Sequence, residues 1–181
     1  MGIKASSANG VDVTKISCTR SGASGGSSYA VLGVSLGDGN DSITYDNATG
    51  QAANSALLML GSGNDKAADD TITVGTDAIV FGDDGNDTVH LGARSDAYIF
   101  TGDDTVYADG ADSSVYAGPD NGTVYGGLGD DIIYGNDGND TLYGNGGDDV
   151  ISGDAGNDKL YGGPGRDKLS GGTGTNVVLQ D

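Results

Sequence analysis

The feature that most constrains this chain is a nine-residue repeat that runs without a break from Gly126 to Leu179. Across its six units, glycine holds the first and fourth places, and aspartate holds the sixth place except in the last unit, which has asparagine. The eighth place is always aliphatic: Ile133, Leu142, Ile151, Leu160, Leu169 and Val178. Such a period is typical of solenoids, in which each unit buries its apolar side chain only by stacking on its neighbours.

Each unit divides into a turn and a short strand. The first six residues are polar and glycine-rich, and glycine adopts the positive φ angles that tight turns require. The last three residues place one apolar side chain between two others, which is the alternation of a strand with one buried face. Two consecutive units make one coil, with the aliphatic side chains inside. The sequence therefore predicts an all-β, right-handed parallel β-roll or β-helix solenoid.

The repeat resembles the RTX family of bacterial Ca²⁺-binding nonapeptide proteins, whose pattern is G-G-x-G-x-D-x-U-x. Six tandem matches carry the resemblance. It implies a β-roll with several Ca²⁺ ions bound between stacked turns. It also implies secretion from the cell and folding outside it in the presence of calcium.

Stacking of these two-unit coils collects the sixth-place residues into two columns, one on each side of the roll. Carboxylates in successive coils, about 4.8 Å apart, repel by about 1 kcal/mol in water and about 3.5 kcal/mol at an effective dielectric constant of 20. Ca²⁺ reverses the sign, because it binds six to eight carboxylate and carbonyl oxygen atoms, whereas Mg²⁺ demands a stricter geometry. An EF-hand is excluded because the chain contains no glutamate.

The metal ligands that we expect in the regular repeats are sixth-place side chains and turn glycines with free carbonyl groups. The side chains are Asp131, Asp140, Asp149, Asp158, Asp167 and Asn176. The glycines are Gly127, Gly129, Gly138, Gly147, Gly156 and Gly165. Because Asn176 is neutral, we expect the last site to be weaker or absent. The alternative role of each aspartate is a turn acceptor or a solvated charge, which we favour for Asp130, Asp148, Asp137 and Asp154.

Similar turns continue upstream with less regular spacing. One column is expected to run back through Asp104, Asp87, Asp65 and Asp41, with Gly122 at the ladder position of the coil after Asp104. The opposite column is expected to run back from Asp131 through Asp112, Asp96 and Asp77, whose turns lack the full glycine pattern of the calcium-binding repeat.

We expect one continuous domain with three parts. Residues 1–28 are an N-terminal cap or leader segment containing a strand at 11–18. Residues 29–97 form irregular, wider coils with G-x-G-N-D turns, and residues 98–181 form the regular roll. In the middle part we expect strands at 29–36, 42–45, 56–60, 71–74, 78–81 and 88–91.

Composition excludes several classes of function. The chain has 27 acidic residues, eight lysines and arginines and a net charge of -19, so it lacks the basic face of a nucleic-acid-binding protein. No apolar run approaches the length of about 18 residues that predicts insertion into a membrane. The one cysteine, Cys18, excludes an internal disulfide. With one histidine, His90, and no glutamate, no zinc-protease motif exists, and Ser24 lacks the flanks of a nucleophile elbow, so we expect no enzyme activity.

Tyrosines recur in every second unit: Tyr107, Tyr125, Tyr143 and Tyr161 in one series, and Tyr98, Tyr116 and Tyr134 in another. They should form outward columns that stabilise the stack, or alternatively contact a glycan, a cell surface or a neighbouring domain. The predicted function is that of a secreted, extracellular calcium-binding protein with a structural or adhesive role. The alternative is the C-terminal calcium-binding module of a larger secreted lipase or protease.

Overall fold

In the computed structural model, residues 77–82 and 84–180 are described in full, together with the backbone of six strands upstream of them. The upstream strands are β1 (Gly2–Ser7), β2 (Ser17–Cys18), β3 (Leu32–Gly33), β4 (Asp41–Asp46), β5 (Ala56–Met59) and β6 (Thr71–Val74). The next six are β7 (Ala78–Phe81), β8 (Thr88–Leu91), β9 (Asp96–Tyr98), β10 (Thr105–Ala108), β11 (Ser114–Tyr116) and β12 (Thr123–Tyr125). The last six are β13 (Ile132–Tyr134), β14 (Thr141–Tyr143), β15 (Val150–Ser152), β16 (Lys159–Tyr161), β17 (Lys168–Ser170) and β18 (Val177–Leu179). The all-β class is thus confirmed for the described residues.

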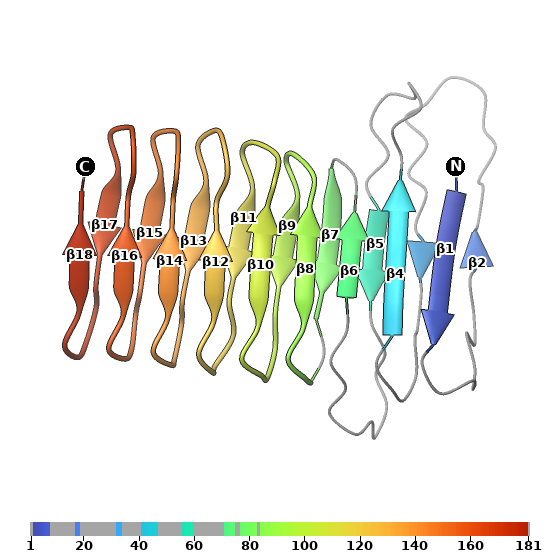
Figure 1. Cartoon of the computed structure of the whole chain (residues 1–181), viewed down its shortest axis with the longest axis horizontal. Helices are drawn as coiled ribbons and strands as arrows, with labels where there is room; N and C mark the ends of the chain where they lie inside the picture. Colours follow the sequence, from blue (N-terminus) through green and yellow to red (C-terminus); the bar gives the residue numbers. More distant parts are fainter. Residues whose placement is uncertain are drawn as a thin grey trace.

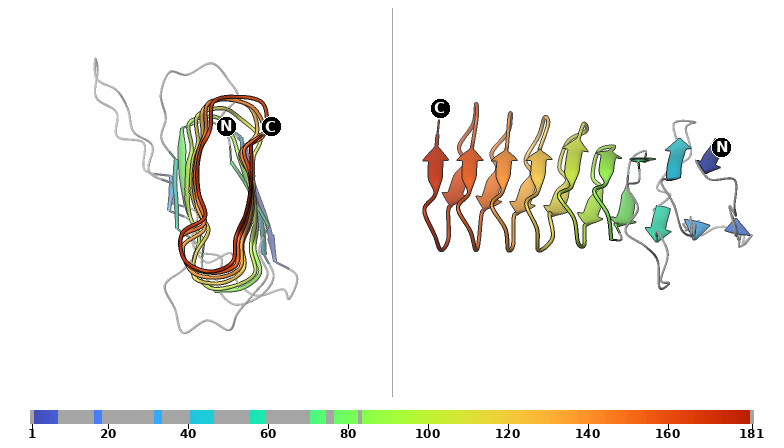
Figure 2. Two further views of the ribbon diagram at one scale, coloured as in Figure 1. Left: turned by 90° about the vertical axis from the view of Figure 1, so that its left-hand side faces the viewer. Right: turned by 60° about the horizontal axis from the view of Figure 1, so that its bottom comes forward.

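From β4 onward, consecutive strands alternate between two sheets (Figure 1). One sheet has the order β1-β4-β6-β8-β10-β12-β14-β16-β18, and the other has the order β17-β15-β13-β11-β9-β7-β5. All pairings within them are parallel except that of β1 with β4. Viewed along the long axis, the regular coils superpose as one flattened loop (Figure 2). The expected parallel β-solenoid is therefore confirmed, while its handedness stays a prediction.

The strand register repeats once every two nonapeptide units in the regular part. Val106 is the partner of Val124, one coil later, and the same row continues through Leu142, Leu160 and Val178. Farther upstream the step is one residue shorter, as between Thr88 and its partner Thr105. The wider N-terminal coils and the boundaries after residues 28 and 97 stay predictions, because most residues between the upstream strands lie outside the described part.

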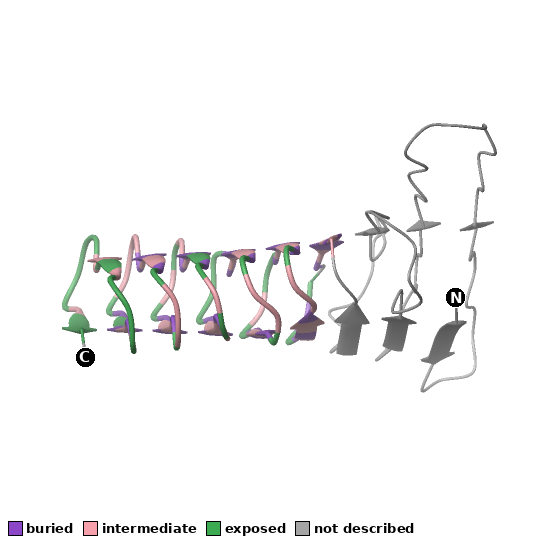
Figure 3. Ribbon diagram, turned by 90° about the horizontal axis from the view of Figure 1, so that it is seen from above, coloured by how far each residue is buried: buried purple, intermediate pink, exposed green. Residues whose placement is uncertain are grey.

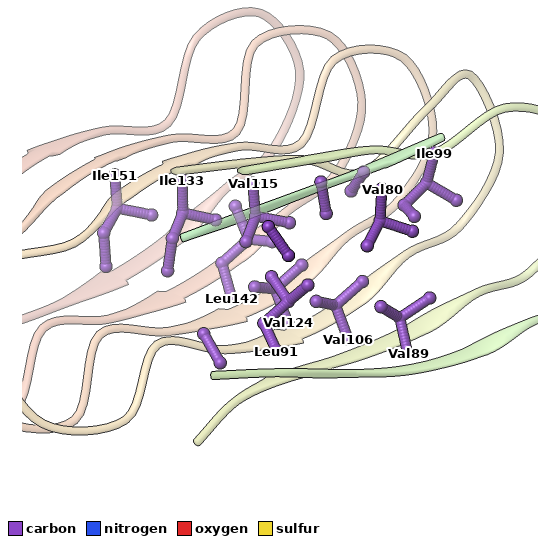
Figure 4. Close-up of a cluster of buried hydrophobic side chains, with 14 of the residues drawn as sticks. Val80, Val89, Leu91, Ile99, Val106, Val115, Val124, Ile133, Leu142 and Ile151 are labelled. Carbon is purple, nitrogen blue, oxygen red and sulfur yellow. The ribbon is translucent and has the colours of Figure 1, made fainter. Parts of the chain in front are cut away.

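The core is one row of apolar side chains between the two sheets. The eighth-place residues Ile133, Leu142, Ile151 and Leu160 are fully buried, and Figure 4 shows two of them, Ile133 and Ile151, in line with Val115. Burial declines toward β18 (Figure 3), where Val178 has the same register but is 43 % exposed. The expected inward aliphatic column is thus present, and its last member is open because no described coil covers it.

The glycine at the fourth place of each nine-residue unit allows the turns to stack. Gly147 has a φ of 135°, a region that side chains other than hydrogen disfavour. A Cβ atom there would lie 1.9 Å from the carbonyl oxygen of Gly129, one coil earlier. Both the backbone angle and the close approach therefore require glycine.

The upstream strands fall largely where the sequence predicts them. The described strands β3 to β8 each lie at an expected position, and all but β4 are contained within the expected range. Of the predicted strand at 11–18, only β2 is described, and it pairs antiparallel with β3. β1 was not expected, and it pairs antiparallel with β4. No repeat marks residues 1–28, so no periodic signal was available for β1.

Candidate metal centre

The sixth-place aspartates point into the turns rather than into solvent. The side chains with at most 2 % exposure are Asp87, Asp104, Asp131, Asp140, Asp149 and Asp158. From Asp104 onward, one oxygen of each carboxylate accepts a hydrogen bond from the backbone of the preceding coil: the N–H of Asp131 donates to Asp149 Oδ1 at 2.8 Å, and that of Asp140 donates to Asp158 Oδ1 at 3.0 Å. Asp149 in turn donates to Asp167 Oδ1 at 3.0 Å. The acids thus form two hydrogen-bonded columns inside the solenoid.

The second carboxylate oxygen has no such partner. Oδ2 is buried without a hydrogen bond in Asp104, Asp131, Asp140, Asp149 and Asp158. Burial, reinforced by neighbouring carboxylates and opposed by the backbone hydrogen bond, raises the pKa of Asp104, Asp131 and Asp140 to about 7. The same causes raise the pKa of Asp149. A buried, unpaired acceptor costs about 1–3 kcal/mol and more when it is charged, so these turns favour a proton or a cation.

The second oxygen lies beside a backbone carbonyl group of the following coil. A Cβ atom on Gly144 would lie 2.3 Å from Asp149 Oδ2 and 2.7 Å from the carbonyl oxygen of Gly162. The two oxygens are therefore no more than about 5 Å apart. On the other side, a Cβ atom on Gly135 would lie 2.3 Å from Asp140 Oδ2 and 2.8 Å from the oxygen of Gly153. The first-place glycine keeps this space open.

This donor set fits a hard cation. Within the described residues, no group of three or more histidine, cysteine or acidic side chains converges on one point. The oxygens that do meet are one carboxylate and one main-chain carbonyl, which are the donors that Ca²⁺ accepts. Thiolates and imidazoles, the usual ligands of structural zinc, are absent from the regular turns.

The expected glycines lie in the same turns, and their role as carbonyl ligands stays a prediction. The fourth-place glycines Gly129, Gly138, Gly147, Gly156 and Gly165 all have positive φ angles. The carbonyl group of Gly127 accepts a hydrogen bond from the N–H of Gly146 at 3.1 Å. Sequence reasoning did not name the first-place glycines such as Gly144 and Gly162, which lie beside the second carboxylate oxygen. The available signal in the sequence was that glycine holds the first place in all six units.

The upstream prediction is confirmed for one column as far back as Asp87 and is wrong for the other column. The N–H of Asp87 donates to Asp104 Oδ1, and that of Gly122 donates to Asp140 Oδ1. Gly122 therefore holds the ladder position, as expected. The side chain of Asp41, the first residue of β4, and the whole of Asp65 lie outside what is described. The row Thr71, Thr88, Thr105 is preceded in the sequence by Asp70, Asp87 and Asp104.

The opposite column does not pass through Asp112, Asp96 and Asp77. The N–H of Ser113 donates to Asp131 Oδ1, and the N–H of Ala78 donates to Ser95 Oγ. Serines thus occupy the ladder positions. Asp112 and Asp77 lie one residue earlier, at positive φ, and Asp96 lies one residue later, as the first residue of β9. The error came from following the acids instead of the register that strand pairing sets.

Two further columns occupy the fifth place of the turns. On one side, Asn139 Nδ2 donates to Asn121 Oδ1 at 3.0 Å, and Asn157 Nδ2 donates to Asn139 Oδ1 at 3.1 Å. On the other side, the N–H of Asp148 donates to Asp130 Oδ1 at 2.7 Å. Asp130 and Asp148 are exposed, as expected of solvated charges, but they also bind the backbone. Asparagine at the fifth place of alternate units was the available signal.

The tyrosines form the two outward columns that their spacing predicts. Tyr125 and Tyr143 stack with ring centroids 4.9 Å apart and planes inclined by 2°, and Tyr98 and Tyr116 stack at 4.9 Å. His90 extends the first column against Tyr107, and Phe81 extends the second against Tyr98. Each inner ring therefore presents its edge, not its face, to solvent.

Comparison with known proteins agrees with this geometry. A family model of four copies of the RTX calcium-binding nonapeptide repeat matches residues 98–133, 116–151 and 143–178. No curated protein and no solved structure matches the chain. The part of the chain that the structure describes contains no helix that could span a bilayer. Residues 98–178 therefore contain RTX calcium-binding nonapeptide repeats.

Proposed function

We propose that this calcium-binding repeat protein folds around Ca²⁺ ions held between its stacked turns. The observation that carries the proposal is the buried second oxygen of Asp104, Asp131, Asp140, Asp149 and Asp158, which has no hydrogen-bond partner; in Asp149 and Asp140 it lies beside a main-chain carbonyl group. The ligands on one side are Asp131, Asp149 and Asp167. Those on the other side are Asp87, Asp104, Asp140 and Asp158. Asp41 and Asp65 remain candidates from the sequence alone.

The charge of the chain supports a cation over a proton at neutral pH. A net charge of -19 opposes a compact state through self-repulsion. A bound Ca²⁺ ion supplies two positive charges between carboxylates that otherwise repel, and it accepts carboxylate and carbonyl oxygens in irregular geometry. The columns of Asp140 with Asp158, and of Asp131 with Asp149, provide such neighbours at intervals of one coil.

Binding and folding are coupled in this proposal. The turn that brings Asp149 Oδ2 to the carbonyl oxygen of Gly162 exists only when two coils are stacked. An ion that binds the folded chain alone stabilises it by RT ln(1 + [L]/Kd), which is about 1.4 kcal/mol per site at ten times Kd. Several such sites together offset the repulsion. Affinities of about 10⁻⁴–10⁻³ M would suit an extracellular module, so the chain would fold after export.

The setting that follows is extracellular, with a structural or adhesive role. A chain that needs millimolar calcium to fold would stay unfolded where calcium is low. The alternative is a calcium-binding module of a larger secreted enzyme. Fractionation of the native host tests the location: protein in the medium or on the cell surface supports the proposal, and folded protein retained in the cytoplasm contradicts it.

The tyrosine columns offer a contact surface for that role. Beside Tyr143 and Tyr161 lies an open groove of about 480 Å³, which Leu128 and Pro164 also line. Because the ring faces are covered within the column, a glycan, a cell surface or a neighbouring domain would meet ring edges and this groove. Loss of surface adhesion in a Leu128→Asp variant that still binds calcium would support that role, and unchanged adhesion would contradict it.

Isothermal titration calorimetry with Ca²⁺ tests the calcium proposal most simply. We expect several sites of submillimolar to millimolar affinity and much weaker binding of Mg²⁺. Asp149→Asn should lower the number of bound ions, whereas the matched change Asp148→Asn, at an exposed neighbour, should leave it unchanged. Equal stoichiometry in both variants, or no calcium binding, would contradict the proposal.

A further inference from the structure

The last turn of the roll differs from the others in one side-chain atom. Asn176 keeps the first contact of the column, because its Oδ1 accepts a hydrogen bond from the N–H of Asp158 at 2.7 Å. Its second terminal atom is a nitrogen rather than an oxygen. That Nδ2 donates to the carbonyl oxygen of Gly171 at 2.8 Å.

The nitrogen occupies the place that the second oxygen takes in the acidic turns. A Cβ atom on Gly171 would lie 2.8 Å from Asn176 Nδ2. The corresponding distance is 2.4 Å from Gly162 to Asp167 Oδ2 and 2.3 Å from Gly144 to Asp149 Oδ2. The side chains are therefore equivalent in position, and they differ in what they offer: two protons in Asn176, and lone pairs in the aspartates.

An amide nitrogen donates hydrogen bonds at this place, whereas a carboxylate oxygen only accepts them. The amide nitrogen satisfies the carbonyl oxygen of its own turn directly. A carboxylate oxygen in the same place cannot donate, and it lies near the first-place carbonyl oxygen of the following coil, as Asp149 Oδ2 does near that of Gly162. Two acceptors then meet, and a positive charge between them would satisfy both. The second oxygens of Asp140, Asp149 and Asp158 are buried without a partner, whereas Asn176 has one for each terminal atom.

We propose that the amide of Asn176 takes the place of an ion, so that the turn at residues 171–176 closes by hydrogen bonds without calcium and ends the ion column at Asp158. This inference rests on the proposed calcium function and specifies where it stops. It makes the sixth place a switch: aspartate gives a turn that requires a cation, and asparagine gives a turn that does not.

Reciprocal substitutions test the switch by counting ions. Native mass spectrometry at saturating calcium gives the number of Ca²⁺ ions bound to the full chain. We expect Asn176→Asp to bind one ion more than the parent protein. We expect Asp158→Asn to bind one ion fewer and to keep its β-structure in calcium, because the new amide can donate within its turn. The double variant should regain the parent number.

A matched control separates site geometry from charge. Thr175→Asp adds the same negative charge at the neighbouring exposed residue, in the fifth place that Asp130 and Asp148 hold on the other side. It should bind the parent number of ions. An unchanged count in both Asn176→Asp and Asp158→Asn would overturn the inference. A parent protein that binds no calcium would instead overturn the proposed function, so the two failures are distinguishable.

Discussion

Asp149 accepts a hydrogen bond from the backbone N–H of Asp131, one coil earlier, with 2.8 Å between the nitrogen and Oδ1. The same contact links Asp140 to Asp158 and Asp158 to Asn176. Each sixth-place side chain thus has two functions. One oxygen joins adjacent coils, and the other atom is the one that we propose as a cation ligand in the acidic turns.

Replacing Asp149 should therefore harm both stability and binding. Asp149→Ala leaves the buried N–H of Asp131 without its acceptor, which costs about 1–3 kcal/mol, and it removes one calcium ligand. We expect a lower urea midpoint in saturating calcium and at least one fewer bound ion. Asp148→Ala is the control, because Asp148 is exposed, and its effect should be smaller. Equal destabilisation by the two changes would contradict the assigned roles.

A comparison of two neighbouring glycines tests the geometry of the turn. A Cβ atom on Gly144 would lie 2.3 Å from Asp149 Oδ2, whereas the nearest atom to a Cβ on Gly146 is Leu128 Cδ2 at 3.5 Å. Gly144→Ala should weaken calcium binding and destabilise the fold by more than about 2 kcal/mol, in the range of overpacked sites. Gly146→Ala should change stability by less than about 1 kcal/mol. Calorimetry and urea denaturation in calcium measure both effects, and a reversed order would refute the assigned geometry.

The calcium-free chain should be more stable at acidic pH. Burial raises the pKa of Asp104, Asp131 and Asp140 to about 7 in the fold, against about 3.9 in an unfolded chain. Between these values the folded state binds more protons than the unfolded state. The stability that these protonated carboxyl groups contribute to the fold is therefore fully present below about pH 4. It is lost as the pH rises through about 7.

Circular dichroism of calcium-stripped protein measures this dependence. We expect more β-structure at pH 5 than at pH 8, and an apparent calcium affinity that rises over the same interval because protons and Ca²⁺ compete for the carboxylates. Stripped protein with more structure at pH 8 than at pH 5 would show that the buried acids do not govern folding.

The row of apolar core side chains should contribute most to stability where a coil covers it on both sides. Leu142 is fully buried, and Val178, two coils later in the same row, is 43 % exposed. Leu142→Ala should cost about 2–5 kcal/mol, and Val178→Ala less than about 1 kcal/mol, because a half-exposed side chain leaves little cavity behind. Thermal denaturation in saturating calcium compares the two variants, and a larger effect at Val178 would contradict the open end at β18.

The regular coils were predictable because the spacing of the repeat fixes the length of each coil and the register of its strands. The spacing of Leu142, Leu160 and Val178 predicts their shared row, and the glycines around Asp140 and Asp158 predict the turn. The family resemblance supplied the ion. These predictions depend on local sequence alone, since each coil contacts only its neighbours.

The predictions that failed needed information beyond the acids themselves. Ser113 holds the position that we assigned to Asp112, because hydrogen-bond register and not charge fixes the column. The amide contact of Asn176 with Gly171 depends on which terminal atom faces the carbonyl oxygen, and a sequence does not reveal that orientation. The pairing of β1 with β4 joins segments that no repeat relates.

Far-UV circular dichroism during a calcium titration of the chelated protein at neutral pH tests the central claim most directly. We predict a largely disordered spectrum without calcium and a cooperative change to β-structure as calcium reaches its submillimolar to millimolar range. A chain that keeps the same β-spectrum in chelator and in calcium would contradict this claim, because the buried carboxylates would then be satisfied without an ion.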